Sequence, residues 1–109
     1  MLKIILNGAL GNDAIVKEVG NKKAINFDVA VSMDYKDSSG NKVKKTEWVR
    51  AVMWKYEGRS TKIADYLKKG QKVLIEGIPS SEAYKTKDDQ LKSALHVNVK
   101  ELELIGANT

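Results

Sequence analysis

Only one segment of this chain has the pattern of a helix, and it lies between the third and the fourth of five strand-like segments. Within STKIADYLKKG, residues 60–70, the apolar side chains that share one helical face are Ile63, Ala64 and Leu67. Ser60 or Thr61 can cap its start, and Gly70 supplies the left-handed residue that commonly ends a helix. The pattern therefore predicts a β protein with a single short helix.

The rest of the chain alternates between apolar and polar residues, the period of strands whose side chains point to opposite faces. The turn-like segment NGALGND at 7–13 is expected to interrupt the first strand, and KDSSGNK at 36–42 is expected to form a hairpin loop. Pro79 is expected to end the pairing of the fourth strand, and 80–90 to form an arm and loop. The predicted strands cover 2–6 with a continuation at 14–19, then 24–35, 43–54, 72–79 and 93–105.

The fifth segment changes the parity of its apolar residues partway along. One face carries Leu95, Val97 and Val99, and the other carries Leu102 and Leu104. A bulge or sharp bend near Lys100 reconciles the two halves, because one extra residue reverses the alternation.

Five strands with one short helix between the third and the fourth is the order of the OB-fold, an all-β, five-stranded Greek-key barrel. A chain of 109 residues is long enough for one core, so a single domain is expected at 1–106, with 107–109 as a short C-terminal end. Another small five-stranded barrel, or an α+β sandwich, is the alternative that the strand pattern leaves open.

The third strand contains TEWVRAVMW, residues 46–54, with both tryptophans of the chain. Alternation places Glu47, Val49, Ala51 and Met53 on one face, and Trp48, Arg50, Val52 and Trp54 on the other. A buried row would not accept an unpaired arginine, so the second face is predicted to be exposed. Two exposed indoles beside a guanidinium indicate a platform on which bases stack. The alternative is a protein–protein interface, or packing beneath the loop at 36–42.

The charge of the chain favours an anionic partner, because 17 lysines and two arginines against 14 acidic residues give +5. Lysine suits attraction to a phosphate backbone, whereas arginine reads base edges, so little sequence preference is expected.

Several classes of protein are excluded. The chain has no cysteine and a single histidine, His96, so neither a thiolate metal site nor a catalytic triad is expected, and no enzyme activity or cofactor is predicted. No apolar run approaches the length of a membrane span, and the N-terminus lacks the features of a signal peptide, so a cytoplasmic protein is expected.

Five segments of the chain are informative together: KIILNGALGND at 3–13, INFDVAVSMDY at 25–35, TEWVRAVMW at 46–54, IADYLKKGQKVLIEG at 63–77 and the apolar fifth strand. In their order, and nearly in their spacing, they resemble the bacterial single-stranded DNA-binding protein family. The resemblance implies an OB-fold protein that stacks single-stranded DNA on aromatic residues and protects it during replication, recombination or repair.

The resemblance implies four stacking aromatics, at Trp48, Trp54, Tyr35 and Tyr84. Tyr35 is in phase with core residues of its strand, so it reaches the binding face only beyond a bulge or strand end. The other aromatics, Phe27, Tyr56 and Tyr66, are expected to be structural or have no assigned role. Phosphate contacts are expected from Arg50, Lys42, Lys44, Lys45, Lys85 and Lys87.

The family also implies self-association, as a homotetramer or a dimer, through the first strand and exposed sheet faces. The expected location is the cytoplasm of a bacterial or phage-infected cell, in association with the nucleoid. The acidic C-terminal tail typical of the family does not follow ELELIGANT, so recruitment of partners through a tail is not expected. A primosomal, RNA-binding or tRNA-binding OB domain, or an OB-fold interaction module, remains the alternative function.

Overall fold

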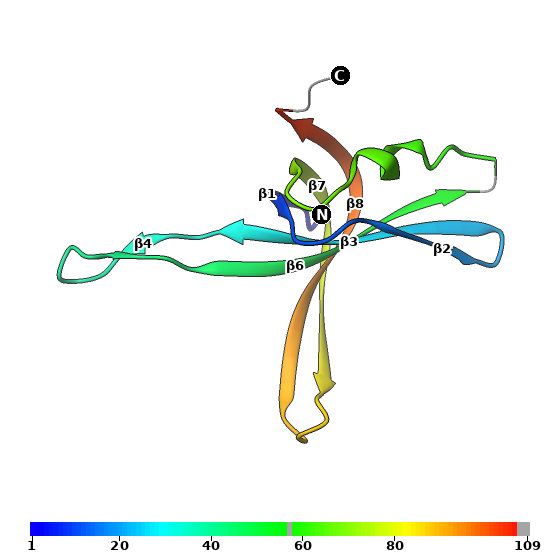
Figure 1. The fold of residues 1–109 in the computed structure, drawn as a ribbon. Helices are drawn as coiled ribbons and strands as arrows, with labels where there is room; N and C mark the ends of the chain where they lie inside the picture. Colours follow the sequence, from blue (N-terminus) through cyan, green and yellow to red (C-terminus); the bar gives the residue numbers. More distant parts are fainter. Residues whose placement is uncertain (57, 107–109) are drawn as a thin grey trace.

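Strand pairing closes a ring of five strands, in the order β1, β3, β6, β8, β7 and back to β1 (Figure 1). The computed structural model describes residues 1–56 and 58–106, except for the side chains of residues 82, 84 and 92. The short end expected at 107–109 lies outside the described residues. The elements are β1 (Ile4–Leu10), β2 (Ile15–Val19), β3 (Lys22–Ser32), β4 (Tyr35–Lys36), β5 (Lys42–Val43), β6 (Thr46–Tyr56), the 3₁₀ helix η1 (Lys62–Tyr66), β7 (Lys72–Lys85) and β8 (Leu91–Ile105).

The ring has the topology predicted for an OB-fold. All its pairs are antiparallel except β6 with β8, which closes the barrel in parallel. β2 follows β1 and extends the sheet along β3, so β1 and β2 together form the interrupted first strand. The only helix among the described residues, η1, lies between β6 and β7, the third and fourth strands of the barrel.

The barrel interior is filled by one apolar cluster to which every ring strand contributes. Ile25, Val29, Val73, Ile75 and Val97 are fully buried within it. Leu67, which follows η1, is also fully buried and belongs to the same cluster, together with Ala64 of the helix. The short helical segment therefore covers one end of the barrel.

The prediction that NGALGND interrupts the first strand from residue 7 is wrong, because β1 runs on to Leu10. Gly8 does not form a turn. It pairs with Val73 of β7, and a Cβ atom there would lie 2.4 Å from the carbonyl oxygen of Ala30 in β3. The glycine is therefore explained by the close approach of β1 to β3 at the barrel seam.

The predicted helix at 60–70 is shorter in the structure, where only Lys62–Tyr66 is helical. The Ser60 hydroxyl accepts a hydrogen bond from the amide of Lys62 at 3.1 Å. Beyond Tyr66 the backbone bonds instead to the end of β1 and to the connection that follows it: the amide of Ala14 donates to the carbonyl of Leu67, and that of Gly70 donates to the carbonyl of Leu10. These tertiary hydrogen bonds replace the next helical turn.

The prediction that Pro79 ends the fourth strand is also wrong. β7 pairs with β8 from Lys72 to Lys85, with Pro79 opposite Val97. Beyond Gly77 the other side of β7 no longer pairs with β1, and proline is compatible with such an edge position. The predicted bulge is confirmed: Gly77 pairs with Val99 and Glu76 with Glu101, which leaves Lys100 as the extra residue.

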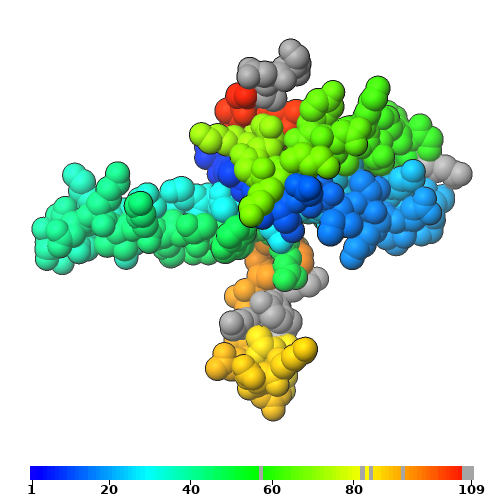
Figure 2. Space-filling view, in the orientation of Figure 1, coloured from blue at the N-terminus to red at the C-terminus, as the bar shows by residue number. Residues whose placement is uncertain are grey.

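Two hairpins extend well beyond the barrel, one ending in β4 and β5 and the other formed by β7 and β8 (Figures 1 and 2). The first turns at the expected loop, where a single Asp37 carboxylate oxygen accepts hydrogen bonds from the amides of Ser39 and Asn41, at 3.0 and 2.8 Å. The long axis of the molecule measures 55 Å, so the hairpins add considerable surface to a small core.

Candidate nucleic-acid interface

The two faces of β6 differ as predicted from the alternation. Val49 and Ala51 are buried in the core, whereas Trp48, Arg50 and Trp54 are exposed on the outer face of the barrel. The exposed residues lie on one row of one strand, which pairs with β3 along its whole length and with β8 at residues 49–52. Their relative positions are therefore fixed by the barrel backbone.

Small residues on β3 face both tryptophans. Trp48 pairs in register with Ala30, and Trp54 pairs with Ala24. An alanine opposite an indole places only a methyl group beside the ring, since directly opposed side chains are only about 4.5–5.5 Å apart at Cβ. Ala24 is itself buried, but both indole rings remain exposed.

Trp48 lies against the backbone at the end of the first strand. A Cβ atom at Gly11 would lie 2.4 Å from Cζ3 of the indole, so the ring occupies the space that a side chain would need. The residue is still 57% exposed. Gly11 therefore supports the ring without covering it.

Trp54, which is 38% exposed, lies between two shallow grooves on the outer face. The first, of about 320 Å³, is lined by Trp54 together with Arg50 and His96. The second, of about 420 Å³, includes Lys22 and Lys100. A flat ligand on this indole would thus have a cation within reach on either side.

Arg50 occupies the centre of the row. In the strand register it lies opposite Asp28 on β3 and opposite His96 on β8. The Asp28 carboxylate accepts a hydrogen bond from the side-chain amide of Asn12 at 3.5 Å, and the side-chain carbonyl of Asn12 accepts one from the amide of Asp28. The guanidinium is exposed at the surface, consistent with contact to an anionic ligand.

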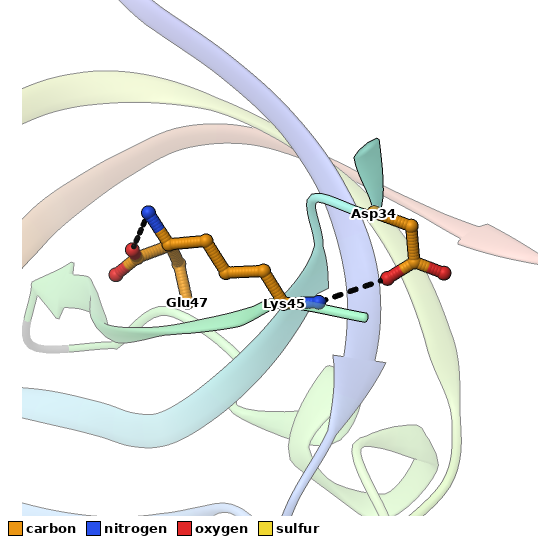
Figure 3. Close-up of polar contacts among 3 residues, drawn as sticks. All are labelled: Asp34, Lys45 and Glu47. Carbon is orange, nitrogen blue, oxygen red and sulfur yellow. Dashed lines mark hydrogen bonds and ion pairs between the residues drawn. The ribbon is translucent and has the colours of Figure 1, made fainter. Parts of the chain in front are cut away.

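The three lysines that precede the tryptophan row have different surroundings. Lys45 donates its backbone amide to Asp34 at 3.1 Å, and its ammonium lies 3.3 Å from the Glu47 carboxylate (Figure 3). Lys42 and Lys44 are exposed and share the parity of Trp48. The charge of Lys45 is thus partly balanced by Glu47, while Lys42 and Lys44 extend the row along the hairpin.

Tyr35 lies beyond the end of β3, in β4, and is 53% exposed. The hairpin contains no bulge between the two pairs of strands, because Ser32–Thr46 and Tyr35–Val43 keep the same register. Alternation therefore keeps Tyr35 in phase with the core residues of β3, opposite to the tryptophan row. It is exposed because the hairpin has left the barrel.

The remaining predicted residues lie on the β7–β8 hairpin. The backbone of Tyr84 pairs with that of Lys92, but its side chain lies outside the described residues. Lys85 ends β7 and Lys87 lies in the turn, both exposed. The β7–β8 hairpin projects from the barrel in a different direction from the hairpin that ends in β4 and β5 (Figure 1).

An aromatic residue without an assigned role, Tyr56, continues the row of β6. The strand ends two residues later than predicted, so Tyr56 falls on the face of Trp54 and is 65% exposed. The same period that identified the tryptophans would have identified it, had the strand been extended to residue 56.

No three histidine, aspartate or glutamate side chains in 1–56 and 58–106 lie close enough together to hold a metal ion. Within that part of the chain, no helix has the length and apolar character needed to cross a membrane. The Lys3 ammonium lies 2.8 Å from Glu76 on the outer face of β1 and β7, and this hydrogen bond raises the pKa of Lys3 and lowers the pKa of Glu76.

A sequence profile of the single-strand binding protein family matches residues 1–105. Single-stranded DNA-binding protein 1 of Chlorobaculum tepidum is 37% identical over 108 residues, covering 96% of this chain and 65% of that protein. The single-stranded DNA-binding protein of Neisseria meningitidis serogroup A is 37% identical over 106 residues, covering 95% and 59%. The chain thus spans less than two thirds of the length of these relatives.

Solved structures have the same barrel. Plasmodium falciparum SSB in complex with ssDNA superposes with a TM-score of 0.77 at 26% identity, covering 96% of this chain and 95% of that one. A deletion mutant of the single-stranded DNA binding protein from Thermus aquaticus gives a TM-score of 0.75 at 17% identity, covering 96% and 50%. The second similarity concerns the fold alone.

Proposed function

The chain belongs to the single-strand binding protein family, and we propose that it binds single-stranded DNA with little sequence preference. The observation that carries this proposal is the exposed row of Trp48, Arg50 and Trp54 on β6. In this proposal the protein serves in replication, recombination or repair, where single-stranded DNA needs protection. Binding rather than catalysis is the activity expected of this family.

Base stacking supplies the contact energy in this proposal. Trp48 and Trp54 each stack a base, with a contribution of about 1–3 kcal/mol per base that depends little on sequence because every base has a π-face. Tyr35 and Tyr84 offer further stacking positions on the two hairpins, which reach away from the barrel, with Tyr35 on the face opposite to the tryptophan row. The bound DNA would then run from the barrel along both hairpins.

Lysine and arginine side chains bind the phosphates. Arg50 lies between the two stacked bases, and Lys42 and Lys44 continue the row of cations onto the hairpin that ends in β4 and β5. Lys85 and Lys87 act in the same way on the β7–β8 hairpin. Lys45 contributes less, since Glu47 lies 3.3 Å from its ammonium.

Titration with oligo(dT) tests the proposal directly. Binding is expected to quench tryptophan fluorescence, and the logarithm of the affinity should fall by about 0.7 per phosphate contact for each tenfold increase in salt. Trp54→Ala should weaken binding by about 1–3 kcal/mol with little change in stability. Val49→Ala should instead destabilise the fold by about 2 kcal/mol and leave the affinity of the folded protein unchanged.

The absence of quenching at low salt would refute DNA binding. Oligo(U) distinguishes the RNA-binding alternative, because contacts to the 2′-hydroxyl favour RNA. Tryptophans that are shielded without DNA and insensitive to either oligonucleotide would indicate an interaction module.

We also propose that the protein self-associates, as a tetramer or a dimer, and that it acts at the nucleoid in the cytoplasm. The outer face of β1 and β7 supports an interface, since Ile5 is 65% exposed and Ile78 is 48% exposed on the same face. Several barrels together would bind a longer strand than the roughly 4–16 nucleotides covered by one OB-fold.

A further inference from the structure

The aromatic row of β6 does not end at Trp54. Tyr56 is two residues further along the same face, about 6–7 Å away along the strand. Both side chains line the 420 Å³ groove, and the Tyr56 ring is 65% exposed. A single strand that leaves Trp54 in this direction would therefore meet a second accessible aromatic ring.

The ammonium of a lysine on the neighbouring strand lies over the ring of Tyr56. Lys22 pairs with Tyr56 across β3 and β6, and its ammonium lies 5.2 Å from the ring centroid, within the range of a cation–π interaction. Within the residues that the structure describes, no carboxylate forms an ion pair with Lys22. One cation thus orients the ring and remains available to a phosphate.

A second groove continues beyond Tyr56. It has a volume of about 490 Å³ and is lined by Tyr56, Lys22, Lys23 and Arg59, with Glu18 as the acidic residue among the described residues that line it. Gly20 and Gly58 also line it, so part of its floor has no side chains. The end of β6 and the β2–β3 turn meet at this end of the molecule, opposite the β4–β5 hairpin (Figure 1).

We propose that bound single-stranded DNA continues past Trp54, with one base stacked on Tyr56, the adjacent phosphate on Lys22, and the backbone entering the groove beside the β2–β3 turn. This inference rests on the proposed function and extends its binding path. The path requires an aromatic ring and an excess of cations, and both grooves supply them.

A length series of oligo(dT) tests the extension, with tryptophan quenching as the readout in each variant. Oligonucleotides too short to reach beyond Trp54 should bind Tyr56→Ala as well as they bind the wild type. On longer ones, Tyr56→Ala should bind about tenfold more weakly, within the effect usual for one stacking residue. Tyr56→Phe should retain wild-type affinity, because it keeps the ring.

Lys22→Gln tests the same path by removing the cation while keeping the tyrosine at position 56. It should reduce the slope of log affinity against log salt by about 0.7 on long oligonucleotides, the effect of one lost phosphate contact. Tyr66→Ala is the matched control for Tyr56→Ala, since this η1 tyrosine is also exposed, at 52%. The Tyr66→Ala variant should bind oligo(dT) like the wild type.

The outcomes separate the two proposals. If the wild type quenches with oligo(dT), but Tyr56→Ala matches its affinity at every length and Lys22→Gln keeps its salt slope, the extended path is refuted and DNA binding stands. If the wild type does not bind, the proposed function itself fails.

Discussion

Trp48 and Trp54 share one face of β6 but are held in different ways. Trp48 rests on the backbone at Gly11, whereas Trp54 lies between two grooves. The position of Trp48 thus depends on a glycine from another part of the chain, where any side chain would displace the indole. Single-residue changes at either position should therefore affect binding by different routes.

Gly11→Ala is expected to move the indole of Trp48, because the new methyl group would lie 2.4 Å from Cζ3. The displaced ring is on the surface, so the free energy of unfolding should change by less than about 1 kcal/mol. Oligo(dT) affinity should fall, as measured by fluorescence titration. In a Trp48→Ala background the same substitution should have no further effect, and a further loss there would contradict the role of Gly11.

Much of the tryptophan face could be predicted from the sequence, because a period of two fixes which side chains share a face. The surroundings of single residues could not. The ion pair of Lys45 with Glu47 and the contact of Trp48 with Gly11 depend on side-chain packing in three dimensions. Tyr56 was missed because the predicted strand ended at residue 54, and strand ends carry the weakest sequence signal.

At the level of whole elements, β1 shows how a turn-like sequence can form a strand. Asn7-Gly8 commonly marks a turn, yet here it lies within β1, which pairs along its length with β7. Gly8 is needed at the seam because the carbonyl of Ala30 leaves no space for Cβ. Tertiary packing therefore decides the conformation of this dipeptide.

Gly8→Ala should destabilise the protein by about 1–3 kcal/mol, since the clash is with backbone that cannot rotate away. Asn7→Ala is the matched control: Asn7 is the neighbouring residue of the same strand, with an exposed side chain. Urea unfolding of both variants measures the difference. If Gly8→Ala and Asn7→Ala unfolded with equal free energies, the close approach of β1 to β3 would not require a glycine at residue 8.

The resemblance to the single-strand binding protein family is confirmed by the match over 1–105, and the order of the barrel strands and the bulge at Lys100 are also confirmed. The errors concern element length. The helix was predicted too long because hydrogen bonds between residues 67–70 and residues 10–14 replace its last turn. The fourth strand was predicted too short because an edge position tolerates Pro79.

For the molecule as a whole, the outer face of β1 and β7 is the surface on which the proposed self-association depends. Ile5 and Ile78 are exposed there beside the Lys3–Glu76 ion pair. Apolar side chains on a paired sheet face, next to charges that can exchange partners, are suited to contact with a second barrel.

Ile5→Lys is expected to lower the mass measured by light scattering, because a charge would have to be buried in the interface. The new lysine lies opposite Glu76, so the barrel itself should remain folded. Ile15→Lys provides the control, since Ile15 on β2 is 54% exposed but lies away from this face. An unchanged mass for Ile5→Lys would place the interface elsewhere.

The parallel contact between β6 and β8 has a consequence for how the chain is made. Val49 pairs with Leu95, so the strand that carries the tryptophans acquires its second neighbour only when the last strand has been synthesised. Until then β6 presents an unpaired edge, and pairing between such distant segments forms slowly. A ribosome that pauses before β8 would therefore hold a nascent chain prone to pairing with its neighbours, and release of the last strand is the step that ends this exposure.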